Sequence, residues 1–314
     1  MKHSPPPVPL HFLVPGFSKC GTTTLCALLA EHPQLYMPIG KGKKEPCFFN
    51  RPNFHEQWSW YARFFKDAPP QTSHGEGSTI YSAATHEKQC RERILALYPQ
   101  IKLIFIARDP FDRIESSYRH THWMGSKLGV YLPFSLEEAI RKPNPIIRKP
   151  NSIIEDARYF TRLENYRQHI PANQILMIFL EELMTDPHQV LTQCFEFLGV
   201  DPSVRINNPS RRLNKGNEKL YDTPKLRDMR RYVINPETSL ALKKLPLDIQ
   251  DQFLNKLGLR KQFTGEPLEW SSQAERYAVE MLHEDIQKFL EMNGKPFDFW
   301  PRFAKAVSAC HDTN

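Results

Sequence analysis

The stretch FLVPGFSKCGTTTLCALL, residues 12–29, decides the fold class of this chain. Its apolar start predicts a buried strand from His11 to Val14, and the pattern from Thr23 to Glu31 predicts the helix that follows. The junction between strand and helix offers unpaired backbone N–H groups at the positive end of the helix dipole. We therefore expect an anion to bind there.

The lysine of this junction stands in an unusual place. In a nucleoside-triphosphate loop of the form G-x-x-x-x-G-K, the lysine follows the second glycine. Gly16 and Gly21 reproduce the frame, but Thr22 occupies the lysine position and Lys19 precedes Gly21. This disfavours ATP or GTP, and a simple threonine-capped turn stays an alternative. The candidate anion-binding residues are Ser18, Lys19, Cys20, Gly21, Thr22, Thr23 and Thr24.

Two further apolar runs predict strands, IKLIFIA at residues 101–107 and QILMIFL at 174–180. The continuous apolar character of the first suits a strand buried on both faces of a parallel sheet. Helical patterns cover residues 87–98, 111–120 and 156–169. A proline-started helix is expected to end at Gly199. Alternating strands and helices predict a three-layer α/β/α fold with a central parallel sheet. Ligands of such sheets bind at the carboxyl ends of the strands.

The second strand run ends at such a position in ARDPFDRIESSYRH, residues 107–120. Arg108 is suited to a bidentate contact with a phosphate, and Asp109 before Pro110 is a good helix start. Arg113 and Ser116 are three residues apart on one face of the predicted helix. An ordinary Arg–Asp pair on a polar helix surface is the alternative.

Composition narrows the function classes. The 314 residues carry a formal charge of +7 and 40% hydrophobic residues, with a pI near 9.0, so an anionic ligand is expected. Basic residues are spread along the chain, which disfavours nucleic acid. We expect one domain over residues 9–302, with flexible ends at 1–8 and 304–314.

Cysteines and apolar runs bear on the compartment. The six cysteines form no C-x-x-C pair, so we expect reduced thiols. The sequence has no signal-peptide core and no apolar run near the ~20 residues of a membrane helix. A cytoplasmic protein without a membrane span is the expectation.

The two anion-binding segments together resemble those of sulfotransferases that use 3′-phosphoadenosine 5′-phosphosulfate (PAPS). FSKCGTTTL resembles the 5′-phosphosulfate loop, in which a lysine two residues before the glycine reaches the phosphosulfate; Lys19 has that place. The pattern R-D-P-x-x-R-x-x-S-x-Y resembles the 3′-phosphate site. The resemblance implies that Arg108 and Ser116 hold the 3′-phosphate, with Arg113 and Tyr118 in support.

A later segment, PSRRLNKGNEKLY, resembles the loop that closes over the nucleotide phosphates in this family. The matching residues are Arg211, Lys215 and Gly216. A basic surface loop is the alternative. The family also implies a fold similar to that of P-loop kinases.

The segment KGKKEPCFFN, residues 41–50, supplies the candidate base. Among neighbouring lysines the Glu45 carboxylate should stay ionised and be able to accept a proton, although a solvated charge cluster is equally plausible on the residues alone. Glycosaminoglycan-type sulfotransferases carry a similar K-E-x-H-F-F segment, whose glutamate is the proposed general base. Glu45 matches this glutamate, and Cys47 replaces the usual histidine.

A second departure lies in GEGSTIY, residues 75–81. The comparable segment of that branch reads E-K-T-P-x-Y, and Gly77 stands in place of its lysine. Either Lys43 or Lys44 substitutes from the other side, or the acceptor is not a heparan-like polysaccharide. Lys44, Glu76 and His74 are the substrate-side candidates, and Glu76 is the reserve candidate for the base.

The resemblance implies transfer of a sulfuryl group from PAPS to a hydroxyl or amine, with release of 3′,5′-ADP. A glycan or a polar small molecule is the expected acceptor. No metal is expected, because the histidines and cysteines lack zinc-site spacing. A kinase with a variant phosphate loop and a non-catalytic nucleotide-binding relative are the alternatives.

Overall fold

The computed structural model describes residues 6–40, 42–128, 133–142, 152–213, 219–232, 247–263 and 268–311. The chain divides into two compact units, one of residues 1–113, 154–213 and 275–314, and one of residues 114–153 and 214–274. Helix α4 (Pro110–Leu128) begins in the first unit and continues in the second. The single domain expected over residues 9–302 stays a prediction.

The first unit is built on a five-stranded parallel sheet with the strand order β2-β3-β1-β4-β5. The strands are β1 (Leu10–Gly16), β2 (Leu35–Tyr36), β3 (Ser73–Glu76), β4 (Lys102–Ala107) and β5 (Ile175–Phe179). The three apolar runs therefore form the centre and one edge of the sheet, as predicted. The two short strands β2 and β3 lack an apolar run and were not expected.

The central strands are buried on both faces, which explains their continuous apolar sequence. Phe12, Leu13 and Val14 of β1 and Ile104 to Ala107 of β4 have no exposed surface. Pairing of β4 with β5 runs in register from Leu103 opposite Ile175 to Ala107 opposite Phe179.

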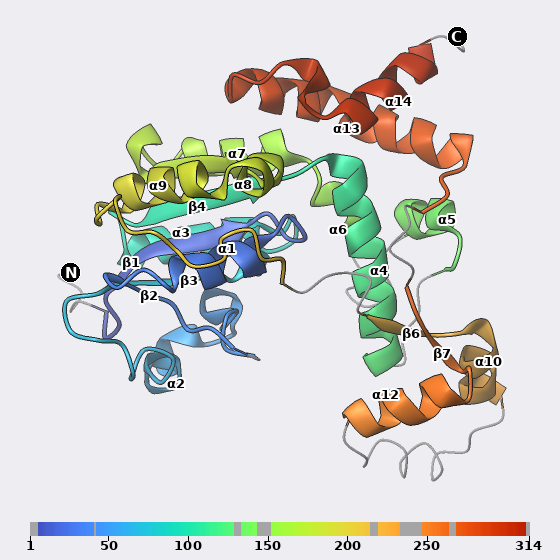
Figure 1. Ribbon diagram of the computed structural model, residues 1–314, viewed down its shortest axis with the longest axis horizontal. Helices are drawn as coiled ribbons and strands as arrows, with labels where there is room; N and C mark the ends of the chain where they lie inside the picture. The colour runs from blue at the N-terminus through green and yellow to red at the C-terminus, as the bar shows by residue number, and fades with distance from the viewer. Residues whose placement is uncertain are drawn as a thin grey trace. The chain divides into compact units, whose positions relative to one another are not determined.

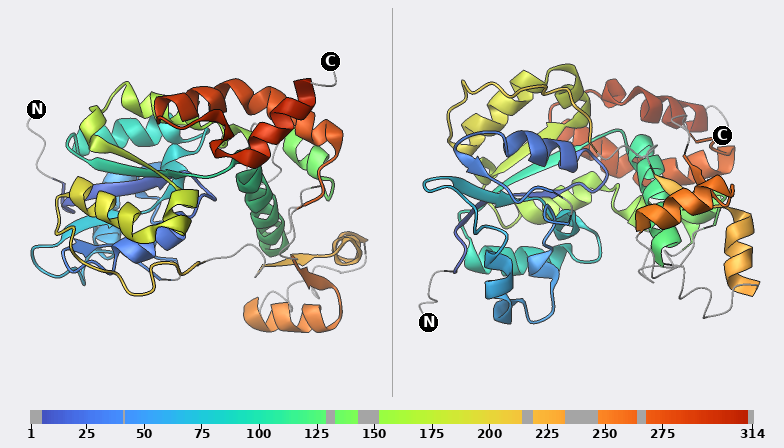
Figure 2. Two further views of the ribbon diagram at one scale, coloured as in Figure 1. Left: turned by 45° about the horizontal axis from the view of Figure 1, so that its top comes forward. Right: turned by 60° about the horizontal axis from the view of Figure 1, so that its bottom comes forward.

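Helices cover both faces of the sheet, so the predicted three-layer fold is confirmed (Figures 1 and 2). Helices α1 (Thr22–Leu29) and α9 (Pro187–Leu198) lie on one face, where the His32 ring lies 4.4 Å from that of Phe195. Helices α3 (Glu87–Leu97) and α7 (Tyr159–Arg167) lie on the other, where Asn165 donates to Glu87 over 2.8 Å.

Helix α9 shows how the sequence sets helix ends. Pro187 is its first residue, the Asp186 carboxylate accepts from the Gln189 N–H, and Gly199 ends it with a φ of 77°. The remaining helices of this unit are α2 (Trp58–Ala62), α8 (Leu180–Thr185), α13 (Ser272–Met292, whose first three residues fall in the second unit) and α14 (Pro301–His311).

The second unit contains most of α4, α5 (Leu136–Arg141), α10 (Pro224–Tyr232), α12 (Leu247–Lys256), and the antiparallel strands β6 (Leu220–Asp222) and β7 (Arg260–Gln262). The short helix α6 (Ser152–Glu155) lies where the chain passes from this unit to the first. The core of the second unit holds a buried cation, Arg260. This side chain is 1% exposed and pairs with Asp222 over 2.6 Å and with Asp251. Burial of a guanidinium is tolerated here because carboxylates compensate its charge.

Among the described residues, no helix combines the length and the apolar character that crossing a bilayer requires.

The close approach of β1 and β3 yields a stability prediction. A Cβ atom on Gly75 would lie 2.3 Å from two ring atoms of Phe12, which is fully buried. We expect Gly75→Ala to destabilise the first unit by about 1–3 kcal/mol, because the ring has no free space to move into. Ser73→Ala on the same strand is the control, with an expected change within about 0.5 kcal/mol. Calorimetric unfolding midpoints measure both, and an unchanged midpoint for Gly75→Ala would contradict the packing described.

Candidate active site

The two predicted anion-binding segments leave the sheet side by side. Strands β1 and β4 are parallel neighbours, and the Phe17 N–H after β1 donates to the Ile106 carbonyl of β4 over 2.8 Å. The loop Ser18–Thr24 and Arg108 therefore follow adjacent strand ends. The chain winds to opposite sides of the sheet from these two strands, which is the position where open α/β sheets bind ligands.

The loop after β1 has a backbone shape suited to an anion. Lys19 and Gly21 have φ values of 70° and 95°. A Cβ on Gly21 would lie 2.7 Å from Leu180 Cδ1, so both the conformation and the space require glycine. Helix α1 begins at Thr22 without a side-chain cap and with no acidic residue in its first turn. Its first N–H groups are thus available to an acceptor from outside the helix.

Buried side chains hold this loop against the RDP segment. Arg113, 1% exposed, donates from Nε to the Ser18 carbonyl over 3.2 Å and pairs with Asp156 at 3.4 Å. The Tyr159 hydroxyl donates to the Arg108 carbonyl over 3.0 Å and lies 3.4 Å from Cys20 Sγ. Tyr159 thus joins the two segments, a role that its place on an amphipathic helix does not reveal.

The same burial makes Cys20 unreactive. Loss of solvent raises the pKa of its thiol to about 11, and the nearby Arg113 and Arg108 guanidiniums oppose the shift only in part. Cys20 therefore stays a neutral thiol at the floor of the loop and contributes its backbone.

Arg108 lies directly after β4 and is turned along the start of α4. Its Nη2 donates to Asp112 Oδ2 over 2.8 Å, and 22% of the side chain is exposed. Asp109 caps the helix by accepting from the Phe111 N–H over 2.8 Å, as its place before proline predicts. Ser116 lies further along α4 in the second unit. Its pairing with Arg108 at a 3′-phosphate stays a prediction.

Glu45 is linked to Thr22, at the end of the loop after β1, through a single side chain. The Lys44 ammonium donates to Glu45 Oε1 over 2.8 Å and to Thr22 Oγ1 over 2.9 Å. The Thr79 hydroxyl donates to Glu45 Oε2 over 3.3 Å. With 40% of its side chain exposed, Glu45 is held in place and still accessible to an acceptor.

Aromatic packing fixes the segment that carries Glu45. Phe48 and Phe49 are fully buried, and the Phe48 ring stacks on Tyr61 with centroids 4.1 Å apart. The Cys47 N–H donates to Ser78 Oγ over 2.8 Å. Sequence analysis singled out Gly77 and missed the two residues that follow it, Ser78 and Thr79, whose hydroxyl groups contact this segment.

Glu76 occupies a different environment from Glu45. It is fully buried and accepts from the Tyr81 hydroxyl over 2.6 Å and from the Ser78 N–H over 2.7 Å. Burial raises the pKa of this carboxyl to about 7, against the lowering effect of these hydrogen bonds. The carboxylate orients the turn after β3 and has no exposed surface at which to meet an acceptor, which weakens its candidacy as the base.

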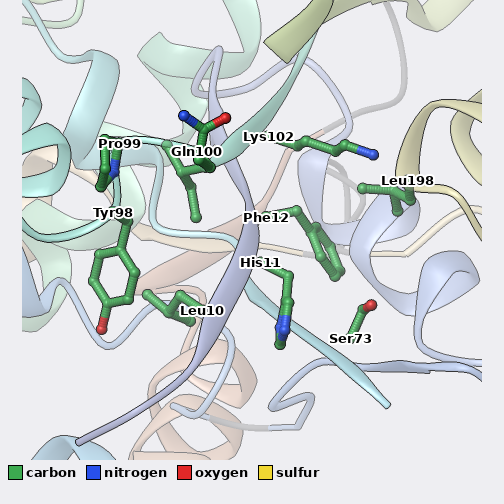
Figure 3. A pocket seen from close by; sticks show the side chains of 10 residues that line it. Leu10, His11, Phe12, Ser73, Tyr98, Pro99, Gln100, Lys102 and Leu198 are labelled. Carbon is green, nitrogen blue, oxygen red and sulfur yellow. The ribbon is translucent and has the colours of Figure 1, made fainter. Parts of the chain in front are cut away.

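His74 lies at the opposite edge of the sheet from the loop. It is paired in register with Leu10, at the start of β1, whereas the loop follows Gly16, roughly 20 Å away at the rise of a strand. The backbone N–H of His74 donates to His11 Nδ1 over 3.0 Å. His11 lines a pocket of about 300 Å³ at this edge, with Leu10, Lys102 and Leu198 (Figure 3). A substrate role for His74 beside the loop therefore lacks support in the geometry.

The segment matched to the phosphate-closing loop begins beside α1. Arg211 donates to the Ala27 carbonyl over 3.0 Å and pairs with Glu31, and the Leu213 N–H donates to Thr24 Oγ1 over 3.1 Å. Residues 211–213 thus run along α1 toward its first turn, with Arg211 engaged at the far end of the helix. Lys215 and Gly216 lie outside the described residues.

Comparison with known proteins agrees with this geometry. The family model for the sulfotransferase domain matches residues 9–227. The human bifunctional heparan sulfate N-deacetylase/N-sulfotransferase 3 is 32% identical over 200 residues, which are 61% of this chain and 22% of that protein. The human N-deacetylase/N-sulfotransferase 2 is 28% identical over 207 residues, 64% of this chain and 23% of that protein. The chain thus spans less than a quarter of the length of these relatives.

Among solved structures, a sulfotransferase from Alicyclobacillus acidocaldarius has the same fold, with a TM-score of 0.53 at 24% identity over 77% of this chain and 99% of that one. The matched family segment contains both anion-binding segments and Glu45. The chain therefore belongs to the PAPS-dependent sulfotransferase family, which the SKCGTTT loop and the RDP segment resemble.

Proposed function

We propose that this chain transfers the sulfuryl group of PAPS to a hydroxyl or amine of a glycan or polar small molecule and releases 3′,5′-ADP. The observation that carries the proposal is the pair of hydrogen bonds that Lys44 donates to Thr22 and to Glu45. Through them an accessible carboxylate is joined to the start of α1, where the 5′-phosphosulfate is proposed to bind. A base this close to the donor loop suits an in-line attack by a deprotonated acceptor.

The donor is proposed to bind across the ends of β1 and β4. The N–H groups at the start of α1 and the Lys19 ammonium receive the 5′-phosphosulfate, and Arg108 and Ser116 receive the 3′-phosphate. Arg113 and Tyr159 support these residues from beneath, since their polar atoms contact the backbone of Ser18 and Arg108.

The chemical step then divides between two residues. Glu45 accepts the proton as the acceptor O–H or N–H bond breaks, and the acceptor atom forms a bond to sulfur. The bond from sulfur to the bridging oxygen breaks, and its electron pair stays on the leaving phosphate. Lys19 and the loop amides stabilise the charge that develops there.

Two observations bear on the class of the acceptor. The named relatives are heparan sulfate N-sulfotransferases, which makes a glycan amine the first class to assay. Gly77, which departs from the glycosaminoglycan pattern, argues for polar small molecules in the same screen with labelled PAPS.

Donor binding is tested directly by thermal stabilisation. At 100 times the dissociation constant, 3′,5′-ADP should stabilise the folded chain by about 2.7 kcal/mol. ATP with magnesium should produce no comparable shift, because a Walker lysine is absent from the loop. A shift with ATP alone would favour the kinase alternative and overturn the proposal.

Removal of the loop lysine tests the stabilisation of the leaving group. Lys19→Ala should lower turnover by ~10²-fold or more, as loss of a transition-state donor does in other enzymes. The exposed Lys66, changed to alanine, controls for the loss of one positive charge. Near-normal turnover in Lys19→Ala, measured as 3′,5′-ADP release, would refute its role.

The base assignment is tested by an isosteric change. Glu45→Gln should retain affinity for 3′,5′-ADP and lose on the order of 10²–10⁴ in rate, because an amide cannot accept the proton. The reaction is followed with any acceptor found in the screen. An unchanged rate would remove Glu45 from the mechanism.

A further inference from the structure

Lys44 follows a path that joins the donor side of the site to the acceptor side. Its ammonium donates to Thr22, the first residue of α1, and pairs with Glu45, the proposed base. Only 12% of the side chain is exposed, so the long aliphatic stem lies against protein along most of its length. A buried stem delivers its charge to a defined position at a smaller loss of side-chain entropy on binding.

The stem packs closely beside Gly77, where a side chain would take up space next to it. A Cβ on Gly77 would lie 3.0 Å from Lys44 Cε and 3.6 Å from Cγ, and 2.5 Å from Cys26 Sγ. The Gly77 N–H also donates to the Lys44 carbonyl over 3.2 Å, which fixes the two segments side by side. An alanine at position 77 would clash with Cys26 Sγ and press against the Lys44 stem.

The neighbouring Lys43 provides a contrast within the same segment. Its side chain is exposed, and its N–H donates to the Gly40 carbonyl in a turn of the loop. Of the two lysines that the sequence left open, Lys44 is the one that contacts both Thr22 and Glu45 in the described part of the chain.

We propose that Lys44 contacts the transferring sulfuryl group, and that Gly77 is the positioning residue that admits Lys44 to the site. The inference rests on the proposed function. A sulfuryl group and the Glu45 carboxylate are both anionic, and both must approach the acceptor, which gives its proton to Glu45 and forms its new bond to sulfur. A cation that contacts both relieves their repulsion.

The contact is tested by comparing two ligands that differ only in the sulfuryl group. PAPS and 3′,5′-ADP share the nucleotide. The affinity for PAPS divided by the affinity for 3′,5′-ADP therefore reports on contacts to the sulfuryl group. Lys44→Ala should lower this ratio by ~10-fold or more, the loss expected for a charge-assisted hydrogen bond. Lys43→Ala is the matched control and should leave the ratio unchanged. An unchanged ratio in Lys44→Ala, measured by calorimetric titration, would overturn the proposal.

The role of Gly77 is tested by moving the lysine. Gly77→Lys alone should reduce the ratio, because the new side chain displaces Lys44. In a Lys44→Ala, Cys26→Ala background, which removes the two side chains nearest to a Cβ at position 77, Gly77→Lys should restore at least part of the PAPS preference. Gly77→Ala in the same background is the control and should restore none. Two outcomes would refute the idea that a lysine at position 77 can bring its ammonium to the place of the Lys44 ammonium. One is no recovery of the ratio with Gly77→Lys in a variant whose unfolding midpoint is normal. The other is equal recovery with Gly77→Ala.

These outcomes are separate from the failure of the proposed function. If the unaltered chain binds neither PAPS nor 3′,5′-ADP, the donor assignment fails. If it binds both and Lys44→Ala leaves their ratio intact, the donor assignment holds and the Lys44 proposal falls.

Discussion

The parallel pairing of β1 with β4 is the constraint on which the site depends. Because the two strands are neighbours and run in the same direction, the loop after Gly16 and the arginine after Ala107 reach the same edge of the sheet. Both strands are buried on each face, so a shift in their register would disrupt the whole core. The separation of the two anion-binding segments is therefore set by backbone hydrogen bonds, which are more rigid than any side-chain contact.

The sequence predicted the parts of this arrangement that have strong local signals. Long apolar runs marked β1, β4 and β5, and proline with glycine marked both ends of α9. The strand β3 was not predicted because its sequence, SHGE, contains no apolar residue. It becomes a strand through its partners, since Phe12 covers Gly75 and buried tyrosines bind Glu76. Such tertiary support leaves no periodicity to read.

The site was predicted unevenly for the same reason. Within the loop, and likewise within the RDP segment, the candidate residues are close together in sequence. Their spacing inside each segment is enough to indicate an anion site. The contacts of Tyr159, Thr79 and Lys44 join segments far apart in the chain, such as Tyr159 with Cys20 and Thr79 with Glu45. The gap at Gly77 was visible as a departure from a pattern. Its meaning emerged only with the position of the Lys44 stem.

Residues 211–213 give the start of α1 an internal reporter. The Leu213 amide is held by the hydroxyl of Thr24, a residue of the first turn of α1, and the next residue in the chain belongs to the second unit. An amide bonded to a side chain exchanges its hydrogen for deuterium only when that bond opens. The hydrogen-exchange rate of the Leu213 amide therefore reports how often its bond to Thr24 at the start of α1 opens. The measurement needs no acceptor, no labelled nucleotide and no turnover.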